Sequence, residues 1–222
     1  MSNGSKSISK EEVALYDRQI RLWGMEAQTR LRNASILILG ITALTLETSK
    51  NLVLAGIGHL TLSDNSPVTS QDLTSQYYTH EADLGKRKDE QLAERLRILN
   101  PLVDVCARTV SDDELQQFDL VVVVGKEFEV VRRVNRACRE RGVKVVVADA
   151  FGLFGFVFVD CLDVHEFVVE TKKVEAKTGE PETRREKKTI QYVPLETSLA
   201  KSFGVPLRRM RRIMSPLIVI YQ

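Results

Sequence analysis

Residues 36–58, ILILGITALTLETSKNLVLAGIG, decide the fold. The apolar run at 36–39 predicts a buried strand, Gly40 predicts a turn, and residues 43–54 predict a helix. A buried strand, a glycine turn and a helix form the opening unit of dinucleotide-binding α/β folds, in which phosphates bind at the helix N-terminus. We therefore predict an α/β fold with a Rossmann-like, doubly wound and mostly parallel sheet.

The glycine turn lacks two of the three glycines that a dinucleotide-binding loop uses. The pattern G-x-G-x-x-G would place glycine at three positions that hold Gly40, Thr42 and Thr45 in this chain. Thr42 places a β-branched side chain where a pyrophosphate approaches bare backbone, and Thr45 replaces the glycine that lets helix and strand pack closely. We therefore predict a nucleotide-binding architecture that has lost its nucleotide. The alternative is a Rossmann-like strand and helix that never bound one.

The composition is that of an ordinary globular chain, and 222 residues suffice for one large domain or for one domain and a fragment. The net charge is only +2, so charge predicts neither a nucleic-acid nor a membrane partner. Cys106, Cys138 and Cys161 form no C-x-x-C pair, so we predict no disulfide framework, no metal site and a reducing compartment. The N-terminus lacks the apolar core of a secretory signal, and no apolar run approaches the ~20 residues of a membrane span.

An amphipathic helix is predicted before the first strand. Ser9 and Glu12 have the spacing of a capping box, and we expect the helix to run to Trp23 and to stop at Gly24. Residues 16–24 read YDRQIRLWG, a long string that resembles the N-terminal motif of the activating enzymes for ubiquitin-like proteins. In that family, an arginine of this motif reaches across a dimer interface to the γ-phosphate of ATP in the partner subunit.

Arg18 matches that arginine, and its planar guanidinium suits the neutralisation of charge on phosphate oxygens. A solvated helix surface is the alternative interpretation of both Arg18 and Arg21. Asp64 ends the second predicted strand, where dinucleotide folds hold the ribose hydroxyls, although here we expect it to cap the following loop. Lys88 lies in a string similar to D-x-G-K-x-K, whose lysine touches ATP in members that bind it; a solvated helix N-terminus is the alternative.

The resemblance runs from about residue 9 to the end of the chain. Within the ubiquitin-activating enzyme superfamily, whose domains are ThiF/MoeB-like Rossmann folds, it is closest to the smaller, non-catalytic subunits of SUMO-activating enzymes of fungal type. The supporting strings lie at residues 8–24, 51–61, 118–122 and 152–160. Members that bind ATP carry a magnesium-binding Asp after the strand at 120–124, where this chain continues as GKE. The resemblance therefore implies an inactive adenylation domain.

The resemblance also implies a division of labour. The chain forms a heterodimer with the catalytic subunit of the SUMO-activating enzyme. That partner binds ATP and Mg, adenylates the C-terminus of SUMO and passes it to a cysteine of its own. This chain has no catalytic residue, binds no cofactor or metal alone, and donates Arg18 in trans to the partner's ATP site, with Arg21, Asp64 and Lys88 as further candidates. The implied location is the nucleus and also the cytoplasm.

The domain organisation is predicted from changes in composition. Residues 1–8 are expected to be disordered, and residues 9–170 form the Rossmann-like domain, with antiparallel strands at 156–160 and 166–170 and aromatic side chains that serve as core or interface. Residues 171–188 are almost free of apolar side chains and predict a charged flexible loop. Residues 189–222 are interpreted as the incomplete start of a returning C-terminal part, so that the domain is C-terminally truncated.

Three other functions are considered. The regulatory subunit of the NEDD8-activating enzyme shares the YDRQxRLWG motif, but it usually carries a long helical insertion where only a short charged segment follows here. A sulfur-carrier-type adenylating enzyme acting as a homodimer would need an intact glycine loop and the magnesium Asp. An inert, truncated interaction module is the third alternative.

Overall fold

The computed structural model describes residues 8–174 and 181–200. Eight α-helices and two short 3-10 helices occur in these ranges, namely α1 (Lys10–Leu15), α2 (Asp17–Trp23), α3 (Met25–Asn33), α4 (Ala43–Ala55), α5 (Ser70–Ser75), η1 (Glu81–Asp83), α6 (Lys88–Leu99), η2 (Asp112–Gln117), α7 (Phe128–Glu140) and α8 (Leu195–Ala200). The strands are β1 (Ser35–Leu39), β2 (His59–Ser63), β3 (Asp104–Ala107), β4 (Leu120–Val124), β5 (Lys144–Phe151), β6 (Phe154–Asp160), β7 (His165–Val174) and β8 (Pro181–Ile190).

One six-stranded sheet carries the fold, with the strand order β3-β2-β1-β4-β5-β6. β1 pairs in parallel with both β2 and β4, and only β6 runs antiparallel, against β5. This is the strand order of dinucleotide-binding folds, in which the direction of winding changes next to β1. The predicted Rossmann-like, mostly parallel α/β sheet is confirmed. The carboxyl ends of β1, β2 and β4 meet at one edge, which is where such folds place a ligand.

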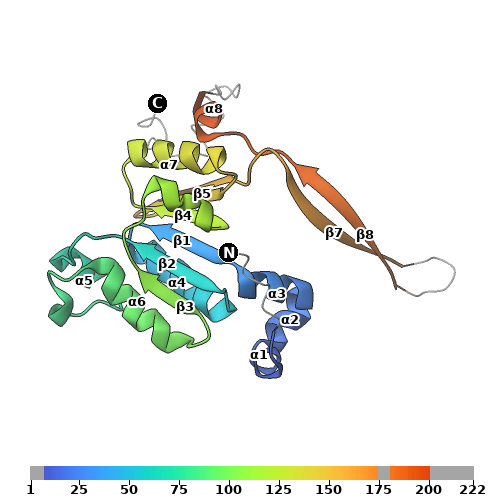
Figure 1. Ribbon diagram of the computed structural model, residues 1–222, viewed down its shortest axis with the longest axis horizontal. Helices are drawn as coiled ribbons and strands as arrows, with labels where there is room; N and C mark the ends of the chain where they lie inside the picture. Colours follow the sequence, from blue (N-terminus) through green and yellow to red (C-terminus); the bar gives the residue numbers. More distant parts are fainter. Residues whose placement is uncertain (1–7, 175–180, 201–222) are drawn as a thin grey trace.

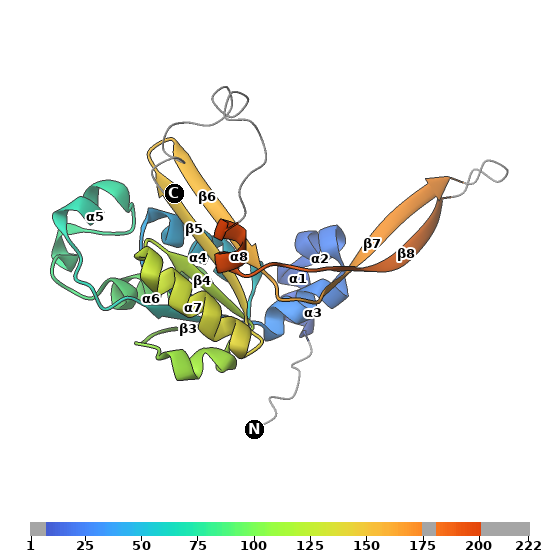
Figure 2. The same ribbon diagram turned by 90° about the horizontal axis from the view of Figure 1, so that it is seen from above.

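Two apolar cores cover the two faces of the sheet, as expected when parallel strands are buried on both sides. Side chains alternate along β1, so that Ile36 and Ile38 pack on one face with residues of α4 and α6, and Leu37 packs on the other with residues of α7. Figures 1 and 2 show α4 and α6 on one side of the sheet and α7 and α8 on the other. The carboxyl ends of β1, β2 and β4 are therefore supported by packed side chains on both faces of the sheet.

The single helix predicted from Ser9 to Trp23 is wrong, because the chain forms two helices that are separated at Tyr16. The Ser9–Glu12 capping box does start α1, but Tyr16 has φ −98° and ψ 17° and starts a new helix. The Tyr16 side chain is only 3% exposed. Burial of this ring requires a change of helix direction that the apolar spacing alone did not reveal.

The flexible loop predicted at 171–188 is also wrong over residues 171–174 and 181–188. These residues belong to β7 and β8, which pair in antiparallel register from His165–Ile190 to Val174–Pro181. Figure 1 shows this ribbon extending away from the sheet. A two-stranded ribbon that is open to solvent needs no apolar face, so its composition resembles that of a loop. Residues 175–180 lie outside the described residues.

Strand pairing near the end of the sheet differs from the prediction as well. We expected strands at 156–160 and 166–170 to pair with each other, but β6 pairs with β5 and β7 pairs with β8. Of the aromatic side chains predicted to serve as core or interface, Phe158 packs against the core, whereas Phe151, Phe154 and Phe156 are each close to half exposed. Residues 201–222, which include the rest of the predicted returning part, lie outside the described residues, as do residues 1–7. No helix within the described ranges is long and apolar enough to cross a membrane.

Substitution of Leu37 tests the buried sheet. Leu37→Ala removes a fully buried side chain from between β1 and α7, so we expect the free energy of unfolding to fall by about 2–5 kcal/mol. Leu153→Ala is the matched control, because Leu153 is 99% exposed and should change stability by less than about 0.5 kcal/mol. Urea unfolding of the native chain and the two variants measures these free energies. Equal losses of stability in Leu37→Ala and Leu153→Ala would contradict the described core.

Candidate functional site

The crevice at the carboxyl end of β1 begins with Gly40. This residue has φ +93°, and a Cβ added to it would lie 2.0 Å from the carbonyl oxygen of Val124, at the end of β4. Glycine is therefore required here by the close approach of the chain to β4. The first glycine of the loop is retained for a structural reason that does not need a ligand.

The two threonines that replace the missing glycines serve local structure. Thr42 is the N-cap of α4, and its side chain accepts a hydrogen bond from the backbone N–H of Thr45. The methyl group of Thr42 lies over Gly125, where an added Cβ would be only 2.6 Å away. Thr45 is fully buried and donates its hydroxyl to the carbonyl of Gly40 at 2.7 Å. Both threonine side chains are thus packed within the loop that a pyrophosphate would approach.

Asp64 closes the next part of the crevice. Its Oδ2 accepts from the backbone N–H of Ile41 at 2.8 Å, and its Oδ1 accepts from the backbone and hydroxyl groups of Ser66. The prediction that Asp64 caps the following loop is confirmed. Burial by itself raises the pKa of Asp64, but the hydrogen bonds from Ser66 and Ile41 and the charge of Lys126 outweigh it and lower the pKa. A loop N–H of the kind that binds phosphate is therefore donated to a carboxylate of the chain itself.

Lys126 is the residue of this crevice that we did not predict. Its Nζ lies 3.4 Å from Oδ2 of Asp64, and its Cε lies 3.0 Å from the position of a Cβ on Gly40. The sequence showed only that the magnesium-binding Asp expected from the resemblance is absent after β4. In the structure, an ammonium group extends from that position across the glycine and pairs with the carboxylate that ends β2. These residues do not fit Mg·ATP as they are arranged, because the Lys126 side chain occupies the space over Gly40 and is paired with Asp64, and residues 125–127 contain no Asp to bind the metal.

Lys88 belongs to a separate, structural cluster. Its Nζ lies 2.9 Å from Oδ1 of Asp72, which also accepts from the Gln76 side chain, while Oδ2 of Asp72 accepts from Thr69. Lys88 and Asp72 are both largely buried at their side chains. The carboxylate of Asp72 fixes the start of α5, and Lys88 neutralises it. Lys88 is thus neither a solvated residue nor a group free to bind a ligand.

Arg18 lies at the opposite end of α4 from the crevice. It is exposed on α2, and no hydrogen bond or ion pair joins it to another residue in the described part of the chain. Arg21 is exposed too, but its Nε lies 2.9 Å from Oδ2 of Asp17. α4 has 13 residues and is therefore about 20 Å long, so the structure does not bring Arg18 together with Asp64 or Lys88.

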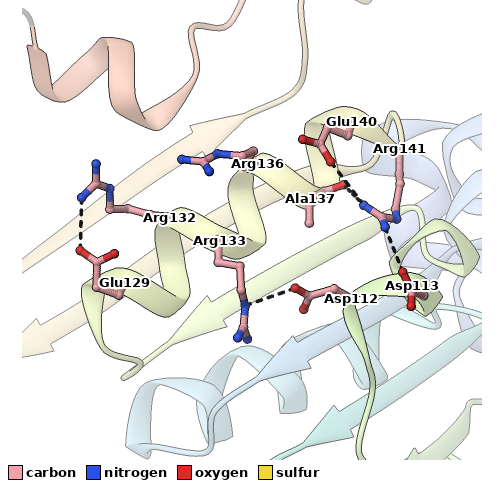
Figure 3. Close-up of a pocket in the computed structure, with 9 residues that line it drawn as sticks. All are labelled: Asp112, Asp113, Glu129, Arg132, Arg133, Arg136, Ala137, Glu140 and Arg141. Atoms are coloured by element: carbon pink, nitrogen blue, oxygen red, sulfur yellow. Dashed lines mark hydrogen bonds and ion pairs between the residues drawn. The ribbon is translucent and has the colours of Figure 1, made fainter.

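A charged cavity on α7 is unrelated to these residues. It has a volume of about 530 Å³ and lies between α7 and η2, as Figure 3 shows. Its arginines pair with neighbouring acids: Arg133 with Asp112 and Arg141 with Asp113. Such exposed ion pairs contribute little and resemble an ordinary solvated helix surface. No predicted site residue lines this cavity, and no cluster of metal-binding side chains occurs among residues 8–174 and 181–200.

Comparison with known proteins decides the family. The model of the ThiF family matches residues 16–195, which is most of the chain. This chain belongs to the ThiF family. The match spans α2, the closed crevice and the start of α8, so the ThiF-family region includes both Arg18 and the altered nucleotide loop.

Several curated relatives of this ThiF-family chain share one name. SUMO-activating enzyme subunit 1 of Xenopus laevis is 40% identical over 211 residues, covering 86% of this chain and 61% of the relative. The human protein of the same name is 36% identical with the same coverage. The DNA damage tolerance protein RHC31 of Saccharomyces cerevisiae is 38% identical over 77% of this chain and 50% of its own length. The predicted resemblance is confirmed, and the chain spans about three fifths of these relatives or less.

Solved structures agree on the fold. The tRNA N6-threonylcarbamoyladenosine dehydratase TcdA of E. coli has a TM-score of 0.57 and 24% identity, covering 64% of this chain and 62% of that one. E. coli MccB, in a structure with AMPCPP and MccA, has a TM-score of 0.54 and 26% identity, covering 60% and 44%.

The closed crevice predicts that the chain alone does not bind Mg·ATP. Thr42 and the Lys126–Asp64 pair fill the loop, and residues 125–127 after β4 read GKE, without the Asp that the resemblance places there as a magnesium ligand. Isothermal titration calorimetry of the isolated chain with Mg·ATP should show no binding at micromolar concentrations. Micromolar affinity for Mg·ATP would show that the crevice opens and that Lys126 does not block the loop.

Asp64 also predicts a dependence of stability on pH. Because its pKa is lowered in the folded chain, the carboxylate stabilises the fold above the ordinary carboxyl pKa of about 4, and this contribution is lost as the pH falls through the folded value. Asp64→Asn should therefore lose less stability than the native chain when the pH is lowered from about 6 to about 3. Urea unfolding across this range measures it, with Glu94→Gln as control, because Glu94 is an exposed carboxylate on α6. Identical pH profiles for Asp64→Asn and the native chain would contradict the described contacts.

Proposed function

We propose that this chain is the non-catalytic subunit of a SUMO-activating enzyme and that it donates Arg18 in trans to the ATP site of a catalytic partner. The observation that carries the proposal is the position of Arg18. Its guanidinium is exposed and has no partner in the described part of the chain, and α4 separates it from the chain's own crevice, which is closed. An unpaired cation on a helix surface is available to a ligand held by another subunit.

The chemistry of such an arginine fits ATP-dependent adenylation. When a carboxylate attacks the α-phosphorus of ATP, pyrophosphate leaves with additional negative charge. A planar guanidinium can neutralise that charge through several parallel N–H donors, and a rigid helix can deliver it from outside the site. Arg18 therefore supplies electrostatic stabilisation, while binding of ATP and Mg and the covalent steps belong to the partner.

The surface around Arg18 also suits a subunit interface. Leu22 follows Arg18 by four residues on α2, so the two side chains project from the same face, and Leu22 is 79% exposed. An exposed apolar side chain beside an unpaired arginine is typical of the central part of an interface. SUMO-activating enzyme subunit 1 is the name of several relatives, and "subunit" marks those proteins as components of a larger enzyme.

The alternatives receive less support. A regulatory subunit of the NEDD8-activating enzyme shares the arginine motif, but the Xenopus laevis and human relatives described above carry the SUMO name. A sulfur-carrier-type homodimer would need ATP to bind in a crevice that Lys126 covers. An inert interaction module would not require an unpaired Arg18. The nuclear and cytoplasmic location stays a prediction from the resemblance.

The proposal is tested by SUMO-dependent exchange of pyrophosphate into ATP. The reaction is run with this chain, with the catalytic subunit and with the mixture, using both this chain and a version extended to the length of the relatives. We expect exchange only in mixtures. Exchange by this chain alone would overturn the proposal, as would mixtures of the extended version that react no faster than the catalytic subunit by itself.

Arg18→Ala should slow this exchange in the mixture without dissociating the two subunits. Loss of an arginine supplied in trans to phosphoryl chemistry can cost about 10³-fold or more in rate. Arg21→Ala is the control from the same helix, because Arg21 is also exposed but already paired with Asp17, and its effect should be far smaller. Size-exclusion chromatography monitors the dimer. A normal rate for Arg18→Ala would rule out the trans role.

A further inference from the structure

The C-terminal end of α4 receives amide side chains from three different parts of the chain. The last carbonyls of a helix have no partner within the helix. Here the carbonyl of Val53 accepts from Asn100, that of Leu54 accepts from Gln19, and that of Ala55 accepts from Gln28, at 2.9, 3.3 and 2.9 Å. Two of these three donors, Gln19 and Gln28, belong to α2 and α3. The end of α4 thus binds the segment that carries Arg18.

Tyr16 is the central contact of this attachment. Its hydroxyl accepts a hydrogen bond of 2.8 Å from the amide of Asn100, the same amide group that donates to Val53. The ring lies against Gly56, the C-cap of α4, which has φ +79°, and a Cβ added there would be 2.5 Å from the Tyr16 ring. Gly56 therefore both ends α4 and leaves space for the tyrosine. Asn100 is 5% exposed, so this polar contact is shielded from water.

These contacts hold α2 on both sides of Arg18. The helix begins directly after Tyr16, and Gln19 is bonded one residue beyond Arg18. At its last residue, the indole N–H of Trp23 donates to Gln28 at 2.9 Å, and Gln28 is itself bonded to Ala55. A helix of seven residues is not stable without such packing. The backbone that carries Arg18 is therefore fixed by contacts made outside α2.

We propose that Tyr16 and Asn100 are positioning residues for Arg18. The inference rests on the proposed function, in which Arg18 acts on a ligand bound by the partner. A group that stabilises developing charge must be held in place before the reaction, and a displacement of about 1 Å can cost 10²-fold in rate. No hydrogen bond or ion pair orients the exposed Arg18 side chain within residues 8–174 and 181–200, so its position depends on the backbone anchored at Tyr16.

The test is a double-mutant cycle in the heterodimer of the full-length protein with its catalytic partner. Tyr16→Leu removes the hydroxyl and part of the ring contact, and we expect it to slow pyrophosphate exchange about tenfold, within the loss that misplacement can cause. In the Arg18→Ala background the same change should alter the rate by less than about twofold, because the positioned group is already absent. Equal losses in both backgrounds would overturn the inference in favour of a general structural role.

Conservative variants and a second measurement separate this inference from the proposed function. Tyr16→Phe removes only the hydroxyl, and Tyr77→Phe is the control because Tyr77 is exposed and distant in sequence from the anchor. Hydrogen exchange of the backbone amides at residues 17–23 should become faster in Tyr16→Phe and should not change in Tyr77→Phe. Unchanged hydrogen exchange in both variants would overturn the role of Tyr16 as the anchor of α2, even if Arg18 is needed for the reaction. A normal rate of pyrophosphate exchange for Arg18→Ala, together with faster hydrogen exchange in Tyr16→Phe, would reject the trans role of Arg18. It would also reject the positioning role of Tyr16, although Tyr16 would still anchor α2.

Discussion

The unpaired backbone groups at the two ends of α4 are the constraint on which the functional arrangement depends. At the N-terminus, Thr42 caps the helix and Asp64 binds the N–H of Ile41, so the chain itself uses donors that a phosphate could bind. At the C-terminus, amide side chains bind the carbonyls of residues 53–55. One helix thus has a closed crevice at one end and the arginine-bearing segment at the other.

The Lys126–Asp64 pair occupies the crevice in which a nucleotide-binding architecture places its ligand. In a parallel sheet, the carboxyl ends of the central strands leave polar backbone groups and a crevice that must be filled. Here a lysine after β4 and an aspartate after β2 fill it with an ion pair, and Thr42 packs its methyl group over Gly125. Both faces of the sheet remain packed, and the proposed role of presenting a side chain to a partner requires such a fixed support.

The sequence predicted the sheet, the altered loop and the capping role of Asp64, since these depend on apolar runs, glycine spacing and local hydrogen bonds. It did not predict the turn at Tyr16, because its cause lies in Asn100 and Gly56, far along the chain. It did not predict the β7–β8 ribbon, because an exposed pair of strands lacks the apolar alternation by which strands are recognised. Lys88 showed a family motif, but its pairing with the distant Asp72 became visible only after folding.

The amino-acid sequence by itself determined the α/β class, the positions of the buried strands along the chain and the identity of Arg18 as the candidate residue, because periodicity and short motifs are local properties. Tertiary structure decided which charges remain free. Asp64, Lys88 and Arg18 are all candidates in the sequence, yet the first two have partners in the folded chain and Arg18 has none within the described residues. Pairing of charges depends on which distant segments the sheet and α4 bring together, and spacing along the chain does not contain that information.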